Sequence, residues 1–130
     1  MDKYMERVKT LREDPKAHHN CAQAVLEAFA PECGLTQEKA FKLGAHFGSG
    51  MKMAATCGAI TGALMVIGML GGGDDAYREF MTAMKGSHEG LTDCADLLKK
   101  NAATGCPKKE HCDGMVYEAV ENVVKVMGLA

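Results

Sequence analysis

Apolar side chains recur at intervals of three or four residues along most of this chain, which is the spacing of one face of an α-helix. Near the N-terminus, Met5, Val8 and Leu11 follow this spacing, with charged residues between them. Pro15 comes shortly afterwards, and proline cannot continue a helix because it lacks a backbone N–H. The pattern therefore predicts an amphipathic N-terminal helix that ends before Pro15.

The same periodicity returns in several segments separated by glycine-rich breaks. We expect helices from about His19 to Glu32, from Thr36 to Phe47, within Met53–Gly73, after Asp74 or Asp75, after Thr92, and from about Glu110 to Met127. The expected N-caps are Thr36, Asp74 or Asp75, and Thr92, the expected ends are Gly34 and Gly128, and Asn101–Lys109 is expected to be a polar loop. Six or seven short helices with short connections predict an all-α, single-domain bundle over residues 1–130.

The segment Met53–Gly73 contains 21 residues without a charge, which is long enough to raise the question of a membrane span. Its glycines and threonines dilute the hydrophobicity, however, and it has no aromatic belt. We therefore interpret it as an apolar, glycine-rich helix at the centre of the bundle. Gly58 and Gly62 lie on one face of this helix and would let another backbone approach closely, inside the fold or across a homodimer.

Charge and length exclude some classes of protein. With 17 acidic and 15 basic side chains, the net charge is −2, which argues against nucleic acid or an anionic membrane as the main partner. A chain of 130 residues can bury a core without covalent staples, so its six cysteines are not needed as scaffolding. The first twelve residues do not resemble a secretory signal. We therefore expect a cytoplasmic protein whose thiols are redox-active, catalytic or metal-binding.

Four of the cysteines fall within about the first turn of a predicted helix: Cys21, Cys57, Cys94 and Cys112. The partial positive charge of a helix N-terminus stabilises a thiolate and lowers the pKa of the thiol. All four also lie on the apolar stripe of their helix, so we expect them to converge on one interior pocket. The alternative is that they are small core side chains, in which case burial would raise their pKa values.

The spacing of the cysteines bears on metal binding. The chain has no C-x-x-C pair, which excludes the local signatures of zinc ribbons, ferredoxin-type clusters and thioredoxin-like sites. A site assembled from distant helices is still open. In that hypothesis Cys21, Cys57, Cys94 and Cys112 hold zinc or an iron–sulfur cluster, with His18, His19 and His111 as additional candidate ligands.

The segment Cys57-Gly58-Ala59-Ile60-Thr61-Gly62 spells CGAxxG, with one cysteine upstream and two downstream. In this order the chain resembles the family of redox-active proteins named for its C_GCAxxG_C_C pattern, and the resemblance covers almost the whole length. It assigns the four pattern cysteines to Cys21, Cys57, Cys94 and Cys112, and leaves Cys33 and Cys106 outside. The resemblance implies a small helical protein with a redox role. Many such proteins are encoded near transporter genes, which implies an association with a membrane transporter.

The leading hypothesis from the sequence is a thiol–disulfide redox protein with an unidentified redox partner. Cys57 is the expected reactive thiolate because its helix is predicted to be the best shielded. Cys21, Cys94 or Cys112 would then resolve the oxidised sulfur as a disulfide. The competing hypotheses are the metal module described above and a non-catalytic helical adaptor that serves a transporter.

Overall fold

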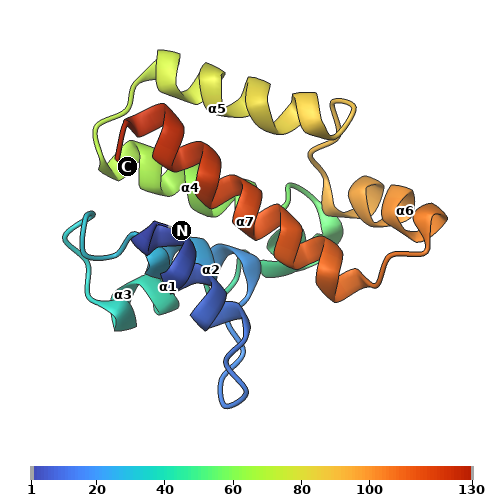
Figure 1. Cartoon of the computed structure of the whole chain (residues 1–130), viewed down its shortest axis with the longest axis horizontal. Helices are drawn as coiled ribbons and strands as arrows, with labels where there is room; N and C mark the ends of the chain where they lie inside the picture. Colours follow the sequence, from blue (N-terminus) through green and yellow to red (C-terminus); the bar gives the residue numbers. More distant parts are fainter. Residues whose placement is uncertain (1, 130) are drawn as a thin grey trace.

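The helices and connections of the chain are seen in the computed structural model, which describes residues 2–129 (Figure 1). Within these residues there is no strand, and the all-α prediction is confirmed. The helical elements in chain order are α1 (Lys3–Arg12), α2 (Cys21–Ala28), α3 (Gln37–Leu43), the π-type turn η1 (Gly50–Ala54), α4 (Gly58–Met69), α5 (Asp74–Ser87), α6 (Cys94–Thr104) and α7 (Lys108–Met127).

The long helix α7 is the element around which the others pack. It crosses the middle of the molecule and contacts α1, α2, α4, α5 and α6 (Figure 1). Its buried face consists of Met115, Val116, Ala119, Val120, Val123 and Val124. Gly128 ends it with a left-handed backbone (φ 64°), as predicted, because glycine adopts this conformation without a steric penalty.

The close approach of α4 and α2 explains two of the glycines. A Cβ at Gly58 would lie 2.7 Å from the carbonyl oxygen of Phe47 and 3.2 Å from the backbone nitrogen of Ala22. A Cβ at Gly62 would lie 3.0 Å from the carbonyl oxygen of Ala22. The prediction that these glycines admit another backbone is therefore confirmed inside the fold.

The helix that is enclosed on all sides is α2, not α4. Every residue of α2 after Cys21 is buried, including the polar Gln23 and Glu27. In α4 the side toward α2 is buried, whereas Met69 at its end is 47% exposed. The prediction that α4 is buried on all sides, which rested on its uncharged sequence, is therefore wrong. No helix within residues 2–129 is long and apolar enough to cross a membrane.

Several predicted boundaries are wrong by a few residues. The second helix ends at Ala28 and is followed by turns to Gly34, so it does not extend to Glu32. The third helix ends at Leu43 and does not reach Phe47, and Leu43 is 49% exposed although its spacing from Ala40 predicts that both belong to the buried face of this helix. The third helix ends here because Gly44 packs directly against the backbone of α2. A Cβ at Gly44 would lie 2.8 Å from the backbone nitrogen of Gln23.

The start of α6 also differs from the prediction. Asp93 is the N-cap, because the Thr92 carbonyl is used to accept a hydrogen bond from the Cys57 N–H at 2.9 Å. The helix then continues to Thr104 and α7 begins at Lys108, so only Gly105, Cys106 and Pro107 of the predicted loop Asn101–Lys109 are not helical. At α5, Gly73 is the N-cap instead of Asp74 or Asp75. The two aspartates occupy the first turn, where their negative charge interacts favourably with the helix dipole.

The glycine-rich break after the predicted third helix leads into a strained segment, Ser49–Ala54, in which most residues are left-handed. Ser49, Met51, Lys52 and Ala54 all have φ values between 52° and 60°, which side chains other than glycine rarely adopt. Gly50 has φ 61°, and a Cβ there would lie 2.4 Å from the carbonyl oxygen of Ala55. This segment leads directly into the residues that surround the cysteines.

Candidate functional site

The four predicted site cysteines line one small pocket of about 50 Å³ between α2, α4, α6 and α7. Its lining consists of Cys21, Ser49, Gly50, Cys57, Gly58, Cys94, Leu97, Leu98, Lys108, His111, Cys112 and Met115. We call this the cysteine pocket. Cys33 and Cys106 are not part of it. The expectation that the four thiols converge is therefore confirmed, and no disulfide links them here.

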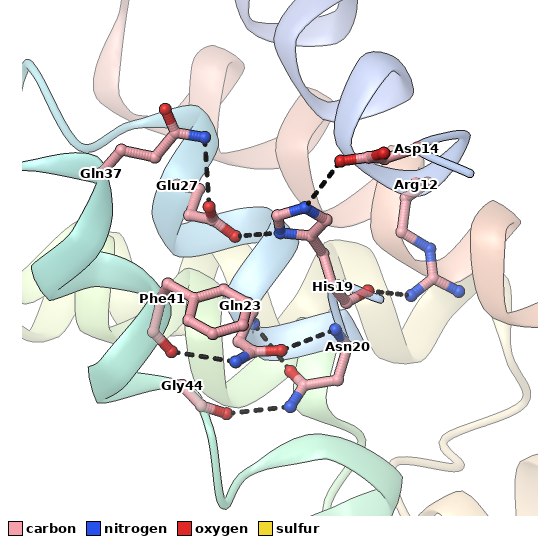
Figure 2. A network of polar contacts seen from close by, with 9 residues as sticks. All are labelled: Arg12, Asp14, His19, Asn20, Gln23, Glu27, Gln37, Phe41 and Gly44. Carbon is pink, nitrogen blue, oxygen red and sulfur yellow. Dashed lines mark hydrogen bonds and ion pairs between the residues drawn. The ribbon is translucent and has the colours of Figure 1, made fainter. Parts of the chain in front are cut away.

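Cys21 is positioned by the network of polar contacts around the start of α2 (Figure 2). The Asn20 side chain accepts a hydrogen bond from the Gln23 N–H at 2.8 Å, and the Gln23 side chain accepts one from the Asn20 N–H at 2.9 Å. The same side chains donate to the carbonyls of Gly44 and Phe41. The capping box and these two bonds fix the first turn of α2 against the C-terminal end of α3.

A buried histidine completes this network beside the N-cap. His19 is 9% exposed, and its ring lies 2.7 Å from the Glu27 carboxylate and 3.4 Å from that of Asp14 (Figure 2). The Gln37 amide donates to the other oxygen of Glu27. His19 is thus held by carboxylates and does not line the cysteine pocket, and neither does His18. Of the three histidines considered as ligands, only His111 reaches it.

Cys57 and Cys94 are held together by a short antiparallel contact. Thr56 and Asp93 form an isolated bridge. The Cys57 N–H donates to the carbonyl of Thr92 at 2.9 Å, and the Cys94 N–H donates to that of Ala55 at 2.6 Å. These bonds join the start of α4 to the start of α6, so two cysteines far apart in the sequence enter the same pocket.

Cys112 lies next to a salt bridge that joins α1 to α7. The Arg12 Nε donates to the Asp113 carboxylate at 2.7 Å, and the Arg12 side chain is only 8% exposed. The Lys109 ammonium contacts the other oxygen of the same carboxylate at 2.7 Å. Because α7 starts at Lys108 and not at Glu110, Cys112 is in its second turn. The helix dipole weakens beyond the first turn, so other groups must determine the acidity of this thiol.

Cys112 is the one pocket thiol with increased acidity. Its pKa is lowered to about 6, chiefly by a hydrogen bond with the Cys21 thiol and then by the positive charges of Arg12 and Lys108. Burial and the Asp113 carboxylate oppose this effect. The same hydrogen bond, together with burial, raises the pKa of Cys21. Near neutral pH the thiolate is therefore favoured on Cys112 over Cys21.

The other two pocket thiols are less acidic than the helix dipole alone predicts. Burial raises the pKa of Cys57, although the N–H groups of Ala59 and Ile60 act in the opposite direction. Burial also raises the pKa of Cys94, and the nearby Cys112 adds to the shift. The expectation that every helix-start thiol has a lowered pKa is thus wrong for Cys21, Cys57 and Cys94. The hydrogen bond with Cys112 and then burial raise the pKa of Cys21, and burial is the main cause for the other two thiols.

The donors in the pocket suit a soft metal ion in type but not in placement. Thiolates and imidazole are the preferred ligands of zinc, and four thiolates can hold an iron–sulfur cluster. Burial, and then the nearby His88, lower the pKa of His111, so its ring is available in the neutral form that binds metals. Within residues 2–129, however, no three Cys, His, Asp or Glu side chains are arranged around a common point as ligands.

Sequence reasoning missed the groups that act on the thiols. Arg12 and Lys108 carry no local signal, since Arg12 belongs to an ordinary amphipathic helix and Lys108 falls in the predicted loop. Four cysteines can form two disulfides in three ways, and no local pattern indicates that Cys21 and Cys112 are neighbours.

Comparison with known proteins shows which family has these four cysteines. The family model described as "Putative redox-active protein (C_GCAxxG_C_C)" matches residues 19–126, a range that includes all four pocket cysteines but not Arg12. Comparison with curated proteins and with solved structures gave no match. Since the matched range covers most of the chain, this protein belongs to the C_GCAxxG_C_C family of redox-active proteins.

Proposed function

We propose that this protein is a dithiol redox protein in which Cys112 and Cys21 exchange electrons with the disulfide of a partner molecule. The observation that carries the proposal is that Cys21 and Cys112 line one small pocket together with the other two family cysteines. The family description supports a redox role, and the lowered pKa of Cys112 supplies a thiolate at neutral pH. A reducing cytoplasm would keep such a pair ready to react.

The proposed reaction has two exchange steps. The Cys112 thiolate attacks one sulfur of the partner disulfide, the partner S–S bond breaks, and a partner thiolate leaves as a mixed disulfide forms on Cys112. The Cys21 thiol gives its proton to the leaving thiolate and attacks the Cys112 sulfur, which releases the second partner thiolate. In total, the Cys112 thiolate and the Cys21 thiol are oxidised to one disulfide. The partner disulfide is reduced to one thiol and one thiolate, and the thiolate takes its proton from solvent.

This proposal changes the order of reactivity expected from the sequence. The sequence alone predicts that Cys57 is the nucleophile, because its helix is expected to be the best shielded. The shielding is present, with Cys57 only 7% exposed, but burial raises the pKa of its thiol and makes the thiolate scarce near pH 7. We therefore assign the first attack to Cys112. Cys57 and Cys94 form a second dithiol, held together by the contact between Thr56 and Asp93.

The proposal predicts a distinct pH profile of thiol alkylation. With iodoacetamide, the reduced protein should show one fast-reacting thiol whose rate rises through pH 6 and levels off above pH 7, because only the thiolate reacts. Cys112→Ser should remove this phase, and Cys57→Ser should preserve it. Cys33→Ser is the matched control outside the pocket. If the fast phase persists in Cys112→Ser and disappears in Cys57→Ser, the assignment to Cys112 is wrong.

A metal module is the second candidate, because the pocket lining offers four thiols and one neutral imidazole, which are ligand types that zinc prefers, although no three of them are arranged around a common point within residues 2–129. Metal analysis and a free-thiol count on the same anaerobically purified sample separate the two functions. The dithiol proposal predicts no stoichiometric zinc or iron, with pocket thiols that fall reversibly on mild oxidation. Stoichiometric metal that is lost in Cys57→Ser and Cys94→Ser would instead make the pocket a metal centre.

A further inference from the structure

A second, wider pocket of about 260 Å³ opens beside the Cys21 and Cys112 pair. It is lined by Arg12, His18, Asn20, Cys21, Ser49, Lys108, Lys109 and Cys112. We call it the basic pocket. It shares Cys21, Ser49, Lys108 and Cys112 with the cysteine pocket, so the two cavities meet at the proposed nucleophile.

The charge of the basic pocket is positive. Arg12, Lys108 and Lys109 line it, and no aspartate or glutamate does. Asp113 forms salt bridges with Arg12 and Lys109, so one carboxylate serves two of the cations. Lys108 has no ion pair within residues 2–129, and its charge already acts on the thiols of Cys112 and Cys94. The three cations of the pocket thus share one carboxylate, and the charge of Lys108 lies at the cavity next to the thiolate.

The size of the two cavities limits what can react there. The cysteine pocket has room for only a few atoms, whereas the basic pocket is somewhat smaller than the sites that enclose drug-sized ligands. A small molecule could place its sulfur atoms at Cys112 only if the rest of it occupied the basic pocket. Cations along the cavity would hold carboxylates there and would raise the local concentration of an anion.

We propose that the basic pocket binds the carboxylate group of a small anionic disulfide and presents its S–S bond to Cys112. This inference rests on the proposed dithiol function and names the class of substrate for it. Lys108 is the principal binding residue, since Arg12 and Lys109 are already engaged by Asp113. Exchange then follows the two steps given above, with electrons passing from Cys112 and Cys21 to the substrate.

The test is a series of three small disulfides that differ in charge: dithiodipropionate (anionic), bis(2-hydroxyethyl) disulfide (neutral) and cystamine (cationic). Reduced protein should react with dithiodipropionate at least tenfold faster than with cystamine, after correction for the intrinsic reactivity of each disulfide with a free thiol. Added salt should diminish this ratio, because screening weakens the attraction of charges near the surface.

Lys108→Gln is the decisive variant. It should lower the ratio of anionic to cationic rates by about threefold to tenfold, the effect of one nearby charge at intermediate dielectric. The variant also removes a charge that stabilises the Cys112 thiolate, but this change affects all three disulfides equally and cancels in the ratio. Lys125→Gln, at the opposite end of α7 and paired with Glu121, is the matched control and should leave the ratio unchanged.

The outcomes separate this inference from the function on which it depends. Equal corrected rates for all three disulfides, with reaction still at Cys112, would overturn the substrate class and leave the dithiol function intact. No reaction of Cys112 with any of the three would overturn both proposals. An anion preference that survives Lys108→Gln unchanged would overturn the role of the basic pocket.

Discussion

At the scale of single residues, the acidity of Cys112 depends on groups that come mostly from elsewhere in the sequence. Cys21 supplies the hydrogen bond, Arg12 supplies a buried positive charge, and Asp113 opposes both. Of these three, only Asp113 is a neighbour of Cys112 along the chain. The thiolate is therefore a product of tertiary packing and not of the helix start.

Two substitutions should shift the Cys112 pKa in opposite directions. Arg12→Gln removes a cation that stabilises the thiolate, so the pKa should rise, and a smaller fraction of Cys112 is ionised at pH 7. Asp113→Asn removes an anion that destabilises it, so the pKa should fall. Ultraviolet thiolate absorbance, followed as a function of pH, measures both shifts. Shifts of the same sign in the two variants would show that the charges do not control this thiol.

The sequence allowed part of this residue-level picture to be predicted. The four cysteines could be selected because each lies on the apolar stripe of a helix, and stripes face the interior. Their acidity could not be ranked in the same way. A thiol near a helix start experiences both the dipole and desolvation, and only the burial of Cys57 or Cys94 in the folded chain shows that desolvation is larger.

At the scale of elements, the contact between α2 and α4 determines where the pocket lies. Gly58 lets the start of α4 approach the start of α2 so closely that a Cβ there would be 3.4 Å from the Cβ of Cys21. A bulkier residue would separate the helices that carry Cys21 and Cys57. The glycine therefore matters for stability and for the geometry of the thiols.

Gly58→Ala should destabilise the protein by about 1–3 kcal/mol, since the added methyl group meets backbone atoms that cannot move independently. Gly68→Ala is the matched control in the same helix, because a Cβ at Gly68 would meet nothing within 4 Å. It should stabilise the protein by about 0.5–1 kcal/mol through the better helix propensity of alanine. Urea denaturation of both variants measures the difference, and equal effects would refute the close approach of the two helices.

The existence of the helices was easier to predict than their ends. Periodicity identified each α-helix, because a buried stripe must repeat with the helical turn. The ends of α3 and α6 depend on tertiary contacts: Gly44 packs against the backbone of α2, and the Thr92 carbonyl is taken by Cys57. No local pattern announces such contacts. The left-handed turn at Ser49–Ala54 was hidden for the same reason.

At the scale of the whole molecule, α7 connects the parts of the site. It packs against five other helices (Figure 1). Its second turn carries Cys112, which lines the same pocket as Cys21 at the start of α2. The all-α class and the convergence of the thiols followed from composition and periodicity. The pairing did not, because it depends on how α1, α2 and α7 are packed together.

The central claim is that Cys21 and Cys112 are the redox pair, and mass-spectrometric mapping of the disulfides tests it most directly. The reduced protein is oxidised with one equivalent of a small disulfide, the remaining thiols are alkylated, and the protein is digested. We expect a peptide that joins Cys21 to Cys112, with Cys33 and Cys106 alkylated. A first disulfide that joins Cys57 to Cys94, or that involves Cys33 or Cys106, would contradict the claim.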